Sequence, residues 1–184
     1  MIEFSCRVKA MRVKKIIDED FNNYKDICMF ICTASCNGKC CREAGIPMSV
    51  CQNAPWRSAP IKEVSDDAII HRYMRNNITT GICFGGLEPL EQFEELFRFI
   101  ERLRRVYRCN DVVVIYTGYY EIEISSQIER LKQFSNIVVK FGRFIPNQSP
   151  HYDEVLGVDL ASDNQYAVIF NPIEGETDVS KTES

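Results

Sequence analysis

Five of the nine cysteines in this chain of 184 residues fall between residues 32 and 51, and this cluster limits what the chain can be more than any other feature. In a reducing cytosol, cysteines this close together are typical of metal or redox sites, not of a disulfide framework. The five are Cys32, Cys36, Cys40, Cys41 and Cys51. The scattered cysteines are expected to be small buried apolar side chains: Cys6, Cys28, Cys83 and Cys109.

Short apolar segments alternate with amphipathic ones, which predicts an α/β fold of βαβ units with a mostly parallel sheet. Strands are predicted at residues 27–31, 79–84, 112–116, 137–141 and 166–170. Helices are predicted at residues 66–75, from residue 90 onward, and at 121–134. Ligands of such sheets bind at the carboxyl ends of the strands. Three unusual segments each follow a predicted strand and should meet at one rim: the cysteine loop, residues 85–89 and residues 117–119.

Polar chain ends set the expected limits of the domain. Residues 1–26 are predicted to be a partly ordered extension, 27–170 the domain, and 171–184 a disordered acidic tail. The net charge of −4 gives no reason to expect a nucleic-acid partner. The longest apolar runs have the length of strands, so no membrane span is predicted. The N-terminus does not resemble a signal peptide, and a cytoplasmic location is expected.

Cysteine thiolates from a loop are the usual ligands of iron–sulfur clusters. A cluster that reacts with a ligand needs one open iron, and therefore three protein cysteines instead of four. The alternative metal is structural zinc, but zinc sites usually repeat a pair of cysteines two residues apart, and this loop has no such pair. Free reduced thiols are the remaining alternative.

Several motifs occur in an order that resembles the radical S-adenosylmethionine (radical SAM) family, and within it the activating proteins of anaerobic ribonucleoside-triphosphate reductase. Cys36-Asn-Gly-Lys-Cys40 resembles the first part of the family's cysteine motif, and Cys51-Gln-Asn-Ala-Pro-Trp56 resembles its third cysteine and the residues after it. The other matching segments are Gly85-Gly86-Leu87-Glu88-Pro89, Tyr116-Thr117-Gly118-Tyr119, Gly142-Arg143-Phe144-Ile145 and Asp163-Asn164-Gln165. Together they span about residues 27–170.

This resemblance implies a partial, open radical SAM-type barrel with five or six strands. It implies a [4Fe–4S] cluster and S-adenosylmethionine (SAM) as cofactors, and reductive cleavage of SAM to a 5′-deoxyadenosyl radical. The implied iron ligands are Cys36, Cys40 and Cys51. Gly85, Gly86 and Glu88 would line the methionine end of SAM. Tyr119 would stack near its adenine or pack in the core. No further catalytic residue is implied.

The partners implied are a large glycyl-radical enzyme, such as an anaerobic ribonucleotide reductase, and an electron donor such as flavodoxin or ferredoxin. Two alternatives remain open: a radical SAM enzyme acting on a small molecule, and a non-catalytic iron–sulfur or zinc protein.

The chain departs from the family pattern at two places. Ten residues separate Cys40 from Cys51 where the family has two, so Cys41 or Cys32 could replace one of the three ligands. Leu87 is inserted before Glu88 and could shift that carboxylate away from SAM.

Overall fold

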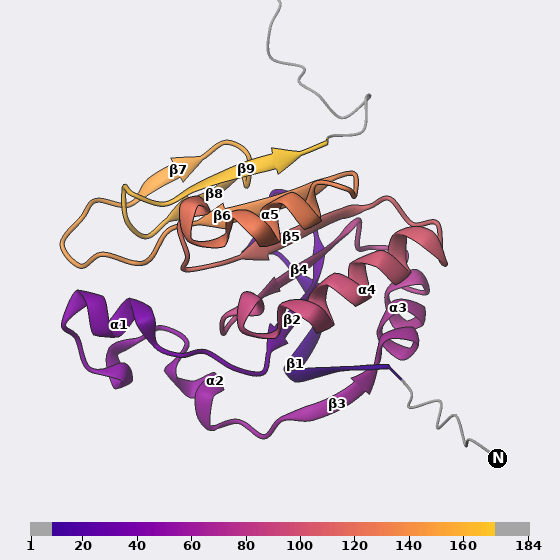
Figure 1. Ribbon diagram of the computed structural model, residues 1–184, viewed down its shortest axis with the longest axis horizontal. Coiled ribbons are helices and arrows are strands. Elements are labelled where there is room, and N and C mark those ends of the chain that lie inside the picture. Colours follow the sequence, from indigo (N-terminus) through magenta and orange to yellow (C-terminus); the bar gives the residue numbers. More distant parts are fainter. Residues whose placement is uncertain (1–8, 172–184) are drawn as a thin grey trace, which may run out of the picture.

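The centre of the fold is a run of four parallel strands, seen in the computed structural model, which describes residues 9–171 (Figure 1). These strands are β2 (Cys28–Thr33), β4 (Gly81–Gly85), β5 (Val112–Tyr116) and β6 (Ile137–Phe141). Their residues are almost all buried and many are β-branched, as expected for strands covered on both faces. The antiparallel strands β1 (Ala10–Asp20) and β3 (Lys62–Ser65) extend one side of the sheet, and β9 (Tyr166–Phe170) extends the other.

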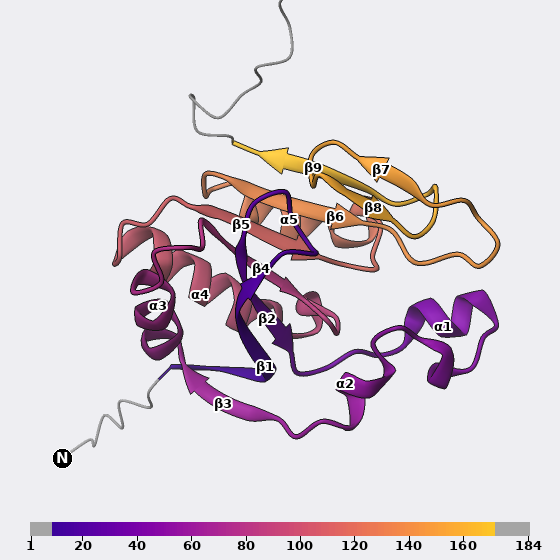
Figure 2. The ribbon, with the colours of Figure 1, turned by 180° about the vertical axis from the view of Figure 1, so that it is seen from behind.

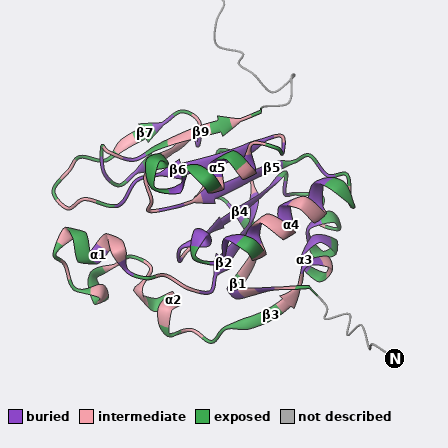
Figure 3. Ribbon diagram, viewed as in Figure 1, coloured by how far each residue is buried: buried purple, intermediate pink, exposed green. Residues whose placement is uncertain are grey.

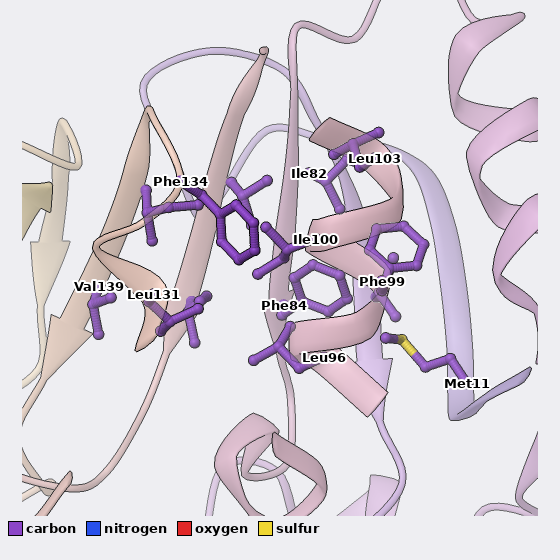
Figure 4. Packing of buried hydrophobic residues seen from close by; sticks show 14 of the residues in the cluster. Met11, Ile82, Phe84, Leu96, Phe99, Ile100, Leu103, Leu131, Phe134 and Val139 are labelled. Carbon is purple, nitrogen blue, oxygen red and sulfur yellow. The ribbon is translucent and has the colours of Figure 1, made fainter. Parts of the chain in front are cut away.

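Three helices cover one face of this sheet: α3 (Asp66–Met74), α4 (Phe93–Arg105) and α5 (Ser125–Leu131) (Figure 1). The Ser65 hydroxyl caps α3 by accepting from the backbone nitrogen of Ala68 at 3.1 Å. Figure 4 shows the core between α4 and the strands, where Phe84 and Phe99 meet edge to face with ring centroids 5.4 Å apart. Burial of this apolar face fixes the helices on the sheet.

The opposite face carries a second apolar cluster, which buries Val114 and Val138. Tyr24, from the segment between β1 and β2, contributes to this cluster. So do Leu156 and Leu160 from the hairpin of β7 (His151–Asp153) and β8 (Val158–Leu160), seen from behind in Figure 2. Both faces of the parallel strands are therefore covered, and the site must form at an end of the sheet.

The sheet has seven strands in the order β3-β1-β2-β4-β5-β6-β9, so the prediction of five or six strands was wrong. Half of its neighbouring pairs are antiparallel, which makes the sheet mixed with a parallel centre. Strand β1 lies in the stretch expected to be a partly ordered extension. Strand β1 was not predicted because it contains several charged residues, and their partners lie far away in the sequence. Buried Lys14, for example, donates from Nζ to the carbonyl oxygens of Arg57 (3.2 Å) and Ala59 (2.5 Å).

The segment expected as one long loop after β2 contains three short helical pieces. They are α1 (Lys39–Ala44), the 3-10 turn η1 (Met48–Val50) and α2 (Ala54–Ser58). In Figure 1, α1 and α2 stand at one end of the sheet, apart from the three covering helices. Among residues 9–171, no helix has the length and apolar character needed to cross a bilayer. The predicted tail lies beyond the described residues, apart from Asn171.

Candidate metal centre

The carboxyl ends of the parallel strands bring together the three segments that the sequence places at one rim. Glu88, after β4, donates its backbone nitrogen to the Ser35 carbonyl oxygen at 2.9 Å, next to Cys36. Its side chain reaches Thr117 and Gly118 after β5. The expected convergence is confirmed, although Leu87 is inserted in the segment.

The carboxylate of Glu88 is buried and accepts three hydrogen bonds. Oε1 accepts from the Thr117 hydroxyl at 2.8 Å and from the Leu90 nitrogen at 3.2 Å. Oε2 accepts from the Gly118 nitrogen at 2.8 Å. Burial raises the pKa of Glu88 to about 7, because removal from water disfavours the charge, while the three hydrogen bonds act in the opposite direction.

Glu88 faces a small hollow that it shares with the cysteine loop. The hollow is lined by Cys36, Asn37, Lys39, Cys40, Glu88, Gly118, Tyr119 and Arg143. Gly118 has no side chain, and a Cβ there would lie 2.7 Å from Cys40 Sγ and 3.6 Å from Glu88 Oε2. A glycine is therefore required for the thiol of Cys40 to approach this rim.

Four thiols lie around the cysteine loop, and Cys36 is central among them. It lies close enough to Cys40, Cys41 and Cys51 for one thiolate to disfavour another, and its Sγ accepts from the Gly38 nitrogen at 3.3 Å. The thiols of Cys41 and Cys51 are neighbours, and the proximity of Cys51 contributes to the raised pKa of Cys41. Cys40 lies near Glu88, away from Cys41 and Cys51. Burial raises the pKa of Cys40 to about 11. These are the soft donors that iron–sulfur clusters and zinc take.

The chemistry of these donors fits a [4Fe–4S] cluster, although their positions do not fit a single ion. No three His, Cys, Asp or Glu side chains in residues 9–171 are arranged to hold one metal ion. Each thiolate of a four-iron cluster binds a different iron, so its ligands lie farther apart than the ligands of one zinc ion. Burial raises the pKa of Cys36, Cys40 and Cys41, so cluster binding must release protons from these thiols.

Cys32 lies apart from the four loop thiols. It is fully buried at the end of β2, beneath the turn after β4. A Cβ on Gly86 would lie 2.3 Å from Cys32 Sγ, and the backbone of Leu87 donates a hydrogen bond to the same sulfur. The residues predicted to bind SAM at this turn, Gly85 and Gly86, therefore also enclose Cys32.

Tyr119 holds the cysteine loop to the rim. Its hydroxyl donates to Glu91 Oε1 at 2.6 Å and accepts from Asn37 Nδ2 at 2.9 Å. The Lys39 ammonium lies 5.3 Å from the centre of the Tyr119 ring. In this structure the side chain contacts the loop that carries Cys36 and Cys40.

Two cations at this site were given no role from the sequence, although Arg143 lies in one of the matching segments. Lys140, at the end of β6, is buried and donates from Nζ to the Gly142 carbonyl oxygen at 2.8 Å; burial lowers its pKa to about 8. Arg143 lines the hollow and pairs with Glu43 and Glu123. A single lysine within the apolar run 137–141 is the one signal that pointed to Lys140.

The pKa of Glu88 predicts how the stability of the cluster-free protein depends on pH. A glutamate has a pKa near 4.3 when unfolded and about 7 here, so the folded state binds the proton more tightly. Stability should be greatest below the unfolded pKa and fall as pH rises through about 7. Because of Glu88, the free energy of unfolding of wild type should fall by roughly 2–3 kcal/mol between about pH 5 and about pH 8. Urea unfolding at several pH values measures this fall.

Glu88→Gln should lack this pH-dependent loss, while Glu101→Gln, on the exposed side of α4, should retain it. Equal pH dependence in wild type and Glu88→Gln would contradict a raised pKa at this carboxylate.

A family model described as "4Fe-4S single cluster domain" matches residues 24–165. No curated protein matches the chain. No solved structure matches it. The matched segment begins before β2, ends just before β9 and includes all four loop thiols. It also spans well over half of the 184 residues. The chain therefore belongs to the 4Fe-4S single cluster domain family.

Proposed function

We propose that this protein is a radical SAM enzyme, which reductively cleaves SAM beside a [4Fe–4S] cluster held by Cys36, Cys40 and Cys51. The observation that carries the proposal is the position of Glu88, a buried carboxylate in the same hollow as Cys36 and Cys40. A carboxylate there offers a partner for the ammonium of an amino acid. The resemblance assigns that contact to the methionine end of SAM.

The protein's own residues would bind and orient the reactants. Glu88 is held rigid by its three donors and would direct an ammonium group toward the cysteine loop. The resemblance also assigns Gly85 and Gly86 to the methionine end of SAM, and their Cβ positions face the buried side chains of Phe30 and Cys32. Tyr119 anchors the loop through Asn37. When bound, the cluster would supply single electrons at low potential.

The partner and architecture in this proposal come from the resemblance. We infer a glycyl-radical enzyme as the protein substrate and a flavodoxin or ferredoxin as the electron donor. We also infer an open radical SAM barrel. The unpaired outer edges of β3 and β9 within residues 9–171 support an open sheet. A small-molecule substrate would be indicated if SAM cleavage proceeded fully without any partner protein.

A second candidate function is favoured by the fourth thiol, Cys41. Cys41 interacts with both Cys36 and Cys51, so it is a candidate for a fourth ligand. Four thiolates would leave no open iron, and the protein would then transfer electrons or bind a partner without cleaving SAM.

The formation of 5′-deoxyadenosine separates these functions. The reconstituted, reduced protein should release 5′-deoxyadenosine and methionine from SAM. Glu88→Gln should lose more than about tenfold of this activity, because losing a hydrogen bond to a charged group costs roughly 1.5–3 kcal/mol. Glu94→Gln removes an exposed carboxylate that pairs with Arg130 and should retain the activity. A full cluster without any 5′-deoxyadenosine would favour the electron-transfer function.

A further inference from the structure

Helix α1 carries two of the four loop thiols but has little apolar surface to fix its position. Cys41 is its one buried residue, and Figure 3 shows the helix largely exposed or half-buried at the end of the sheet. Hydrophobic packing holds α3 and α4 on the sheet, but it cannot hold α1 in the same way. The position of this helix must depend on polar contacts.

One side chain outside the helix joins α1 to the end of β5 and to a neighbouring turn. Arg143 follows β6, and its side chain is 9% exposed. Its Nε donates to Glu43 Oε2 of α1 at 2.5 Å. Nη1 and Nη2 donate to the two oxygens of Glu123 at 2.6 and 3.0 Å, and Nη1 also donates to the Gly118 carbonyl oxygen at 3.0 Å. Glu123 belongs to the 3-10 turn η3 (Glu121–Ile124).

Further contacts fix the Arg143 guanidinium, its backbone and its partner Glu123. The guanidinium lies 4.5 Å from the centre of the Tyr120 ring, in a cation–π contact. The Arg143 carbonyl oxygen accepts from Asn164 Nδ2 at 2.8 Å. Glu123 is fixed in turn by the Tyr120 nitrogen at 2.8 Å and by an ion pair with Lys39. The planar guanidinium has enough donors to bind Glu43, Glu123 and Gly118 at once. The ammonium group of a lysine does not reproduce this geometry.

We propose that Arg143 is a positioning residue that holds α1 against the end of β5 and thereby keeps the Cys40 thiol over Gly118. Gly118 links the two, because its carbonyl oxygen receives Arg143 and its Cα faces Cys40 Sγ. The inference rests on the cysteine loop being the cluster site, and it does not require SAM chemistry. Without Arg143, the carboxylates of Glu43 and Glu123 would share Lys39 alone, and their repulsion would favour release of the helix.

Hydrogen exchange of the cluster-free protein tests this position directly. The reporting amides are those of Arg42, Gly45 and Ile46, which donate to Gly38, Arg42 and Cys41. Arg143→Gln should speed their exchange about tenfold or more, while core amides of β5 stay unchanged. Arg143→Lys should restore part of the protection. The matched control is Arg130→Gln, which breaks a two-point contact with Glu94 on the outer helices and should leave α1 unchanged.

A second variant keeps the test valid if Arg143→Gln does not fold. Glu43→Gln removes the contact from the exposed side of α1 and should also raise exchange there, by a smaller factor. Unchanged exchange of α1 in both variants, with folding shown by urea unfolding, would overturn the proposal.

Iron release gives a readout in the loaded protein. Arg143→Gln should lose iron to a chelator about tenfold faster or more than wild type, and Arg143→Lys should lie between them. If wild type assembles a cluster, and wild type and Arg143→Gln lose iron at the same rate, Arg143 has no positioning role. If wild type takes no cluster, the proposed function fails, while the exchange result still decides the role of Arg143.

Discussion

Reconstitution of Cys36→Ala with iron and sulfide should yield no stable four-iron cluster. Cys36 lies in the same hollow as Cys40 and Glu88, and it is also near Cys41 and Cys51. Without Cys36, the cluster would lose one of its three implied ligands. Substitutions outside the ligand shell lower metal affinity roughly 10–100-fold, and loss of a ligand should exceed that. Iron and sulfide content and visible absorbance measure the loss.

The other loop cysteines separate an open cluster from a closed one. With Cys36, Cys40 and Cys51 as ligands, Cys40→Ala and Cys51→Ala should fail to assemble the cluster, and Cys41→Ala should assemble it. The control is Cys109→Ala, a buried cysteine before β5, which should keep full iron content. Retention of the cluster in Cys40→Ala with loss in Cys41→Ala would place Cys41 in the ligand set. Loss of the cluster in each of the variants Cys36→Ala, Cys40→Ala, Cys41→Ala and Cys51→Ala would favour four-cysteine ligation.

Gly86→Ala should destabilise the cluster-free protein by roughly 2–5 kcal/mol. The backbone at Gly86 has a φ of 75°, which costs a residue with a Cβ about 1–2 kcal/mol. The new Cβ would also lie 2.3 Å from Cys32 Sγ, and overpacking of a buried sulfur adds roughly 1–3 kcal/mol. Urea unfolding at a fixed pH measures the sum.

A double-mutant cycle separates the two costs. Cys32→Ala removes the sulfur, so Gly86→Ala should cost roughly 1–3 kcal/mol less in that background. Gly45→Ala is the matched control, because Gly45 also has a positive φ, of 65°, but no atom within 4 Å of its Cβ position. It should show the backbone cost alone. If Gly86→Ala costs the same with and without Cys32, the turn after β4 does not enclose this sulfur as the structure describes.

Local sequence patterns predicted the centre of the fold. The apolar runs at 112–116 and 137–141 are β5 and β6, and Ser65 is the N-cap of α3 as expected. Strand β1 escaped prediction because its charges are compensated by distant partners. Arg12, for example, pairs with Glu95 of α4 at 2.6 Å. Periodicity within a segment contains no information about such pairs.

The candidate site could also be predicted only in part, because some of its contacts join residues that are distant in the sequence. Strand order alone places Glu88 near Gly118, because the carboxyl ends of parallel strands meet at one rim. The contact between Arg143 and Glu43 joins residues one hundred positions apart and depends on where the short helix α1 comes to lie. That position depends on contacts between distant residues, and no local pattern specifies it.

The most direct test of the account is the electron paramagnetic resonance spectrum of the anaerobically reconstituted, reduced protein, with and without SAM. A cluster next to Glu88 with one open iron predicts a [4Fe–4S] signal that changes on addition of SAM, and a change that is lost in Glu88→Gln. A cluster signal that SAM leaves unaltered would contradict an open iron and favour four cysteine ligands. Zinc binding without any cluster would contradict the assignment of the cysteine loop as an iron–sulfur site.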